Sequence, residues 1–67
     1  MKIDSFCIKL LLAERGMSIS EFERRIGIAK NTFSQVLKRG SCSLVMAGRI
    51  AKGLGVPLKE FVVREGN

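Results

Sequence analysis

The 67-residue chain lacks histidine, tryptophan and tyrosine altogether, and it contains only two cysteines and one proline. A structural zinc site takes about four nitrogen or sulfur ligands, so a single chain with two thiols and no imidazole cannot build one. Catalysis is disfavoured as well, because no histidine can act as a general base and the carboxylates lie towards the two ends of the sequence. We therefore expect no metal, no cofactor, no small-molecule ligand and no enzymatic activity.

The cysteines and the apolar stretches also bear on the compartment. Cys7 and Cys42 form no C-x-x-C pair, and a single disulfide stays possible, but two reduced thiols are the simpler interpretation. The apolar run over residues 6–13 is interrupted by Lys9 and is far shorter than the roughly 20 residues that cross a bilayer. With no signal-peptide pattern, the sequence predicts a cytoplasmic protein that does not enter a membrane.

Acidic residues are half as frequent as basic ones, six against twelve, which gives a net charge of +6. All six acids lie before Arg24 or after Lys59, so every charge in the interval between them is positive. A continuous basic region is typical of a protein that binds a polyanion. The alternative is a charge that serves solubility, but a random scatter would rarely leave so long an interval without an acid. The basic residues of the interval are Arg24, Arg25, Lys30, Lys38, Arg39, Arg49, Lys52 and Lys59.

Apolar residues recur at helical spacing in five segments, and no segment alternates as a strand does. Short connections between the segments favour one compact all-α domain of five helices over residues 1–67, with residues 1–3 as a lead-in and residues 64–67 as a frayed tail. Asp4 and Ser43 are placed to cap the first and fourth helices. The predicted helices cover residues 5–15, 19–26, 30–38, 44–54 and 58–63.

Two features of these helices concern packing. Gly48 costs about 1 kcal/mol relative to alanine inside the fourth helix, so we expect a neighbouring helix to pack closely there. The first helix is more apolar than one small core requires, and one or two of its residues should be exposed or should contact a second copy of the chain. The candidates are Phe6, Ile8, Leu10, Leu11 and Leu12.

The densest local signals lie in the second and third helices. Ser18 and Glu21 have the spacing of a capping box, and Gly27 follows the second helix where a left-handed residue is expected. Two short helices joined by a tight turn that contains glycine form a helix-turn-helix, which we place at residues 18–38. The second helix of such a motif enters the DNA major groove. Its polar residues suit base edges and phosphates, although an ordinary solvated helix face has the same composition.

The sequence resembles the XRE-type helix-turn-helix family of phage repressors and Cro proteins. The resemblance rests on G-M-S-I-S-E-F-E-R-R-I-G-I (residues 16–28), N-T-F-S-Q-V-L (residues 31–37) and S-L-V-M-A-G-R-I-A-K-G-L-G-V (residues 43–56). It implies a five-helix lambda-repressor-like domain that binds double-stranded operator DNA, commonly as a homodimer on a two-fold-related site. By position, it implies that Lys30, Asn31 and Gln35 contact bases and that Ser34 contacts bases or phosphates.

Phosphate contacts are expected from four places and from Arg24 in the second helix. The resemblance assigns them to the N-termini of the second and fourth helices, where backbone N–H groups suit anions, and to the start of the third helix. The basic loop that we expect over residues 38–42 would lie along the DNA backbone, or would serve only as a solvated connector. The expected phosphate contacts are Ser18, Ile19, Arg24, Thr32, Lys38, Arg39, Ser41 and Ser43.

Two residues depart from the family pattern. Ile19 stands where the family often has a phosphate-binding glutamine, so that contact would fall to the backbone N–H. Glu23 replaces a small alanine at the point where the two motif helices approach each other. We expect either that the Glu23 side chain bends outward or that the helix pair is slightly splayed.

Together these features predict a sequence-specific DNA-binding transcriptional regulator, repressor-like, that acts as a dimer. The alternative is an antitoxin-like or adaptor module whose partner is another protein, which the surplus apolar residues of the first helix would favour. The two functions can coexist in one chain.

Overall fold

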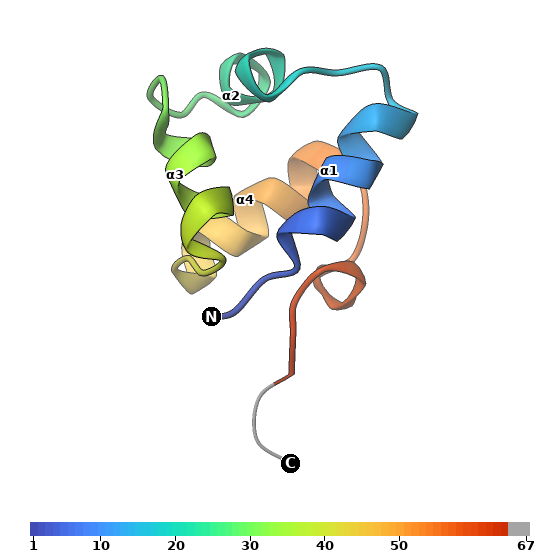
Figure 1. Cartoon of the computed structure of the whole chain (residues 1–67), viewed down its shortest axis with the longest axis vertical. Helices are drawn as coiled ribbons and strands as arrows, with labels where there is room; N and C mark the ends of the chain where they lie inside the picture. Colours follow the sequence, from blue (N-terminus) through green and yellow to red (C-terminus); the bar gives the residue numbers. More distant parts are fainter. Residues whose placement is uncertain (65–67) are drawn as a thin grey trace.

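The computed structural model describes residues 1–64, and these residues form four α-helices and one short 3-10 helix around a common core (Figure 1). The predicted all-α class is confirmed, since residues 1–64 contain only isolated β-bridges and no strand. In Figure 1, α2 and α3 follow one another along the top and left, and α4 runs behind α1. The elements are α1 (Ser5–Glu14), α2 (Ile19–Ile26), α3 (Thr32–Arg39), α4 (Leu44–Leu54) and η1 (Leu58–Glu60).

The predicted fifth helix is wrong, so the count is four α-helices rather than five. Only the 3-10 helix η1 forms after Pro57, and the chain then becomes extended. Val62 pairs with Ile3 in an antiparallel bridge, and the Val63 N–H donates to the Lys2 carbonyl at 2.9 Å. β-Branched residues favour extended backbone, and here a neighbouring segment supplies the hydrogen bonds that a helix would have supplied.

The N-terminal lead-in is an integral part of the fold. Ile3 is only 5% exposed, and its N–H donates to the Gly40 carbonyl at 3.0 Å. On the same side, the Cys42 N–H donates to the Met1 carbonyl at 2.9 Å. The first residues therefore lie between the loop after α3 and the segment after η1, and they tie the two together. The predicted tail is described only at Arg64, because residues 65–67 lie outside the described residues.

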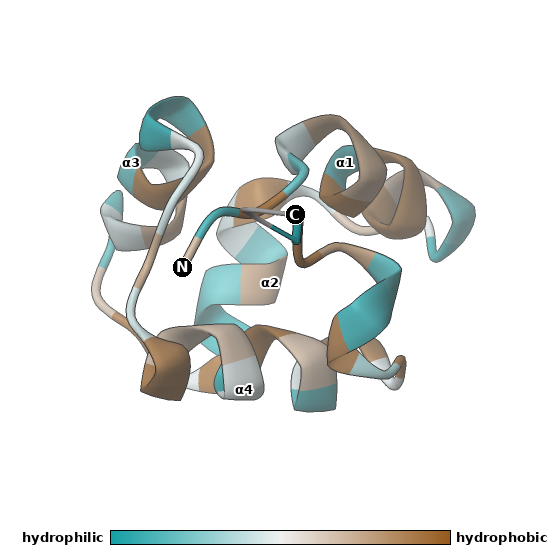
Figure 2. Ribbon diagram, turned by 90° about the horizontal axis from the view of Figure 1, so that it is seen from below, coloured by the Kyte–Doolittle hydropathy of each residue, from teal (hydrophilic) through white to brown (hydrophobic). Residues whose placement is uncertain are grey.

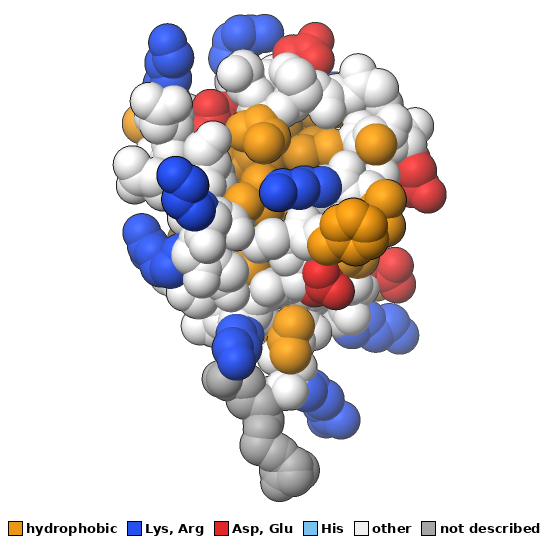
Figure 3. Space-filling model, in the orientation of Figure 1, with side chains coloured by type: hydrophobic (Ala, Val, Ile, Leu, Met, Phe, Trp, Pro, Cys, Tyr) orange, Lys and Arg blue, Asp and Glu red, His pale blue; other side chains and the backbone are white. Residues whose placement is uncertain are grey.

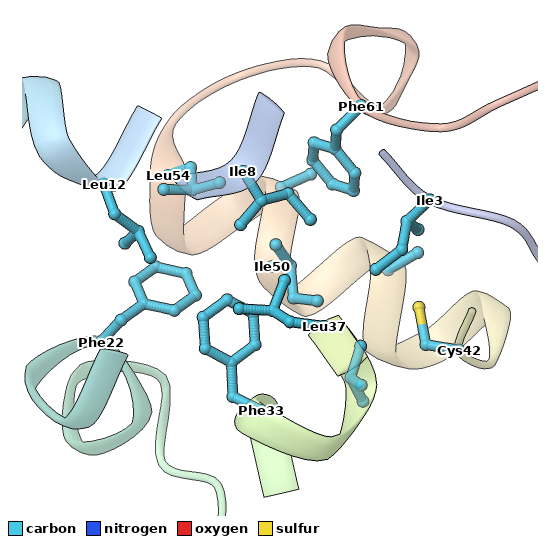
Figure 4. Packing of buried hydrophobic residues seen from close by; sticks show 13 residues of the cluster. Ile3, Ile8, Leu12, Phe22, Phe33, Leu37, Cys42, Ile50, Leu54 and Phe61 are labelled. Carbon is cyan, nitrogen blue, oxygen red and sulfur yellow. The ribbon is translucent and has the colours of Figure 1, made fainter. Parts of the chain in front are cut away.

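The core is built around two phenylalanines, one from each helix of the predicted motif (Figure 4). The rings of Phe22 and Phe33 have centroids 4.9 Å apart and are tilted by 46°, an arrangement that aromatic pairs favour. Both side chains are fully buried. The residues that pack around the pair come mainly from α1, α3 and α4 and from the segment after η1, and they include Ile8, Leu12, Ile50, Leu54 and Phe61.

The predicted caps of α1 and α4 are present. The Asp4 carboxylate accepts the Cys7 N–H at 3.0 Å, and the Ser43 hydroxyl accepts the Met46 N–H at 3.1 Å. Each bond satisfies one of the free N–H groups at a helix start. The first helix ends at Glu14, one residue earlier than predicted. Cys7 is half-buried, Cys42 is buried in its loop, and both are free thiols.

The close helix contact expected at Gly48 lies at Gly53 instead. A Cβ built on Gly48 would meet nothing within 4 Å, whereas a Cβ on Gly53 would collide with the Ile26 side chain and come within 2.9 Å of the Phe22 ring. Gly53 is therefore the residue that lets α4 approach α2. Gly48 faces open space, and nothing in the structure requires a glycine there.

These two glycines make a matched pair for a stability test. Gly53→Ala should destabilise the protein by about 1–3 kcal/mol, because the added methyl group overpacks the contact between α2 and α4. Gly48→Ala should stabilise it by about 0.5–1 kcal/mol through helix propensity alone. Urea unfolding followed by circular dichroism measures both. Equal effects of the two substitutions would contradict this account of α4.

Candidate nucleic-acid interface

The start of α2 has the predicted capping box. The Ser18 hydroxyl accepts the Glu21 N–H at 3.1 Å, and the Glu21 carboxylate accepts the Ser18 N–H at 2.8 Å. The hydrogen bond from the Ser18 backbone lowers the pKa of Glu21, since it stabilises the ionised carboxylate, and the Ser18 side chain adds to the effect. The Glu21 carboxylate thus already accepts the Ser18 N–H at the start of α2, which was predicted to face phosphate.

The turn between the two motif helices is held by local and distant contacts. Gly27 adopts φ 73° and ends α2, a conformation that glycine reaches without steric cost. Across the fold, the Arg49 guanidinium on α4 donates to the Ile26 carbonyl at 2.7 Å and to the Gly27 carbonyl at 3.3 Å. This role of Arg49 was not predicted from the sequence. No local pattern reveals it, because the partners are more than 20 residues away.

Glu23 behaves in neither of the two expected ways. Its side chain turns inward, is only 4% exposed, and accepts the Phe33 N–H at 3.0 Å. The Glu23 side chain, whose bulk was expected to splay the helix pair, instead accepts a hydrogen bond that joins the two helices. A buried carboxylate needs such a donor, and a free N–H at the start of α3 needs such an acceptor. Glu23 of α2 is therefore the cap of α3.

The third helix begins at Thr32, two residues later than predicted, and ends at Arg39 rather than Lys38. Asn31 precedes it with φ 72°, a left-handed conformation that asparagine tolerates better than most residues. The Asn31 side chain makes no capping hydrogen bond, and Glu23 supplies that contact from α2. Lys30 consequently lies in the turn and not in the helix, while Lys38 and Arg39 form the last turn of α3 instead of a loop.

Polar residues cover the outer face of α3. Asn31, Ser34, Gln35 and Lys38 are exposed and together line a shallow hollow of about 260 Å³. Their spacing of three, four and seven residues from Asn31 keeps them on one side of the helix. The opposite side, with Phe33 among others, is buried in the core (Figure 4). The structure therefore brings together three of the four predicted base-contacting residues, and it adds Lys38.

A second hollow brings together cations from α2 and the turn. Arg24 and Lys30 line a depression of about 330 Å³ with Ser20, Glu23 and Ile28. Lys30, the fourth predicted base-contacting residue, is thus separated from the α3 face and lies with Arg24. Both side chains are exposed, and they extend the positive surface from α3 onto α2.

The other predicted phosphate contacts fall into two groups. Ser18 and Ser43 are exposed N-caps whose hydroxyl oxygens each accept a backbone N–H, which leaves the hydroxyl proton available to an anion. Ile19, Thr32 and Ser41 are half-buried. Ile19 packs against the core, Thr32 begins α3, and Ser41 forms a β-bridge with Lys2.

Two short helices that meet at a left-handed glycine, with an exposed polar face on the second one, define a helix-turn-helix protein. A family model described as the Cro/C1-type HTH DNA-binding domain matches residues 8–66. The chain belongs to that family, and the predicted resemblance is confirmed.

No curated protein and no solved structure matches the chain significantly. Within residues 1–64, no helix is long and apolar enough to cross a membrane. The same residues contain no group of three or more possible metal-ligating side chains.

The contact between Glu23 and Phe33 can be tested by substitution. Glu23→Ala should destabilise the protein by about 1–3 kcal/mol, because it leaves the buried Phe33 N–H without an acceptor. Glu23→Gln keeps an acceptor oxygen at the same place and should cost less. Urea unfolding without DNA measures both, and Gln35→Ala on the exposed face of α3 is the control. Equal stability of Glu23→Ala and the wild type would show that the bond contributes nothing.

Proposed function

We propose that the protein is a sequence-specific DNA-binding transcriptional regulator, repressor-like, that inserts α3 into the major groove. The observation that carries this proposal is the exposed row of Asn31, Ser34, Gln35 and Lys38 on α3. Asparagine and glutamine pair bidentately with adenine, and lysine bonds to the acceptors of guanine. Lys30, in the turn before the helix, is assigned to an adjoining base.

Phosphates would be held on both sides of α3. Arg24 supports one side from α2, and Arg39 and Ser43 support the other from the end of α3 and the start of α4. The family membership favours a homodimer on a two-fold-related operator, with half-sites about one helical turn apart. The proposal treats residues 1–67 as one DNA-binding domain without a sensor for small molecules.

A second candidate function is binding to another protein, as in an antitoxin or an adaptor. The exposed side chains of Phe6 and Leu10 on α1 favour it, because they lie outside the predicted DNA face. A single stoichiometric protein partner, together with no measurable operator affinity, would support this function in place of DNA binding.

Selection of binding sites from random DNA, followed by titrations with the selected site, tests the main proposal. Gln35→Ala or Lys30→Ala should weaken specific binding by about 1–3 kcal/mol, because each removes a base contact. Arg39→Ala should weaken binding to all sequences alike. The logarithm of the affinity should fall with the logarithm of salt concentration, with a slope of about −0.9 for each phosphate neutralised.

Lys59→Ala is the matched control for Lys30→Ala, because it removes the same charge from η1, away from α3. It should change affinity far less. Affinity that does not depend on salt, or specificity that survives Gln35→Ala, would rule out the proposed role of α3.

A further inference from the structure

We propose that the protein associates with a second copy of itself through two complementary surfaces. One is the exposed face of α1, which is apolar with an acidic edge. The other is a basic hollow between α2 and α4. The contact would supply the interface for the homodimer proposed above, so it rests on that part of the proposed function but not on DNA binding itself.

The α1 face is formed by apolar residues that the core does not use. Phe6 is 69% exposed and Leu10 is 50% exposed, and Ala13 is exposed as well. These positions follow the spacing i, i+4, i+7 and therefore form one stripe along the helix. The ribbon of α1 is coloured hydrophobic around most of its circumference (Figure 2). A contiguous stripe of this kind marks an interaction site more often than a single exposed side chain does.

Carboxylates gather along one edge of this stripe, beside Cys7. The Cys7 N–H bonds to the Asp4 carboxylate, and the Cys7 thiol donates to the Glu60 carbonyl at 3.2 Å. Partial burial raises the pKa of Cys7, and the negative charges of Asp4, Glu60 and Glu14 raise it further. Acidic side chains flank exposed hydrophobic ones over α1 in Figure 3. Lys9 stands on the other edge, and the Arg15 guanidinium lies 3.8 Å from the Glu14 carboxylate, so the negative charge is concentrated on the edge beside Cys7.

The basic hollow has the opposite charge. Arg25, Arg49 and Lys52 line a depression of about 330 Å³ over the apolar surface of Ile26 and Gly53. It adjoins a second depression of about 480 Å³, since the two share lining residues. No carboxylate lines either of them. The nearby Glu21 carboxylate is held by the Ser18 N–H. The residues that the second depression adds are Arg15, Met17, Leu54 and Gly55.

The basic hollow lies on a different flank of α2 from the predicted DNA face. Consecutive residues of a helix point about 100° apart. Arg24 accordingly lines the depression with Lys30, and Arg25 lines the one with Lys52. None of the residues that line the α3 hollow also lines the basic hollow. A protein bound at the basic hollow would therefore leave the outer face of α3 free for DNA.

The charges of the α1 face and of the basic hollow determine which of the two surfaces pair when two copies associate. Pairing the α1 face with itself would bring carboxylates against carboxylates, and pairing the hollow with itself would bring cations against cations. Only α1 against the hollow joins opposite charges, and it also covers Phe6 with the apolar surface of Ile26. If the two contacts form reciprocally, the pair closes as a two-fold dimer. The surfaces are small, so we expect weak, reversible association of the class that buries less than about 1,200 Å².

Sedimentation equilibrium without DNA tests the proposal over a range of protein concentrations at low salt. The wild type should show a reversible shift from monomer to dimer. Phe6→Ser and Leu10→Ser should each raise the dissociation constant about tenfold or more, because they remove apolar area from the contact. Val45→Ser is the matched control, since Val45 is 74% exposed on α4 and belongs to neither surface. Circular dichroism checks that each variant is folded.

Charge reversal gives the sharper test. Arg25→Glu with Lys52→Glu, and separately Glu14→Lys with Glu60→Lys, should each abolish self-association. Mixing the two double variants should restore it as a one-to-one complex, because each surface then meets its opposite again. Net charge cannot explain that rescue, since both double variants remain positively charged overall.

Three results would overturn the proposal. They are a wild type that stays monomeric at millimolar concentration, association that survives both double variants, and a mixture that fails to associate. Operator titrations at concentrations where the protein is monomeric separate this failure from failure of the proposed function. If the protein binds DNA but never dimerises, the proposed dimer interface is wrong and the proposed DNA-binding function stands.

Discussion

The hydrogen bond from the Phe33 N–H to the Glu23 carboxylate fixes the relation between the two motif helices. Glu23 belongs to α2 and Phe33 to the first turn of α3, so the 3.0 Å bond sets where α3 begins. It lies beside the contact between the Phe22 and Phe33 rings, and the two interactions hold the same pair of helices. Because Asn31 makes no capping bond of its own, α3 depends on α2 for the order of its first turn. The exposed face of α3 is therefore positioned from its buried side.

The fourth helix provides the platform for this pair. Gly53 allows α4 to approach the Phe22 ring and the Ile26 side chain, and one turn earlier Arg49 donates to the carbonyls that end α2. One contact is steric and the other is polar, and both act on the end of α2 that leads into the turn. The left-handed Gly27 then directs the chain into α3. A shift of α4 relative to α2 would therefore also move the turn and, with it, the polar row on α3.

What the sequence revealed depended on the distance between the partners in the chain. The capping box of α2 and the caps at Asp4 and Ser43 join residues three apart, and their patterns predicted them correctly. Helical periodicity placed Ser34 and Gln35 correctly on the exposed side of α3, but Lys30, expected in the same row, lies in the turn. The role of Glu23 was missed because its partner is ten residues away. Gly48 was chosen over Gly53 for a related reason, since a glycine in a helix carries no sign of which neighbour approaches it.

The acidic residues show how residues far apart in the sequence can form one charged surface in the folded protein. Along the chain, Asp4 and Glu60 are far apart, and composition alone says only that the middle is basic. Folding brings η1 against the start of α1, where Cys7 contacts the Glu60 carbonyl, and so gathers Asp4, Glu14 and Glu60 near Cys7. Most of the basic interval lies in the end of α2, the turn, α3 and α4, away from this acidic cluster. Separation of charge along the chain thus becomes partial separation across the molecule, which is consistent with the proposed use of one face for DNA and a different face for protein.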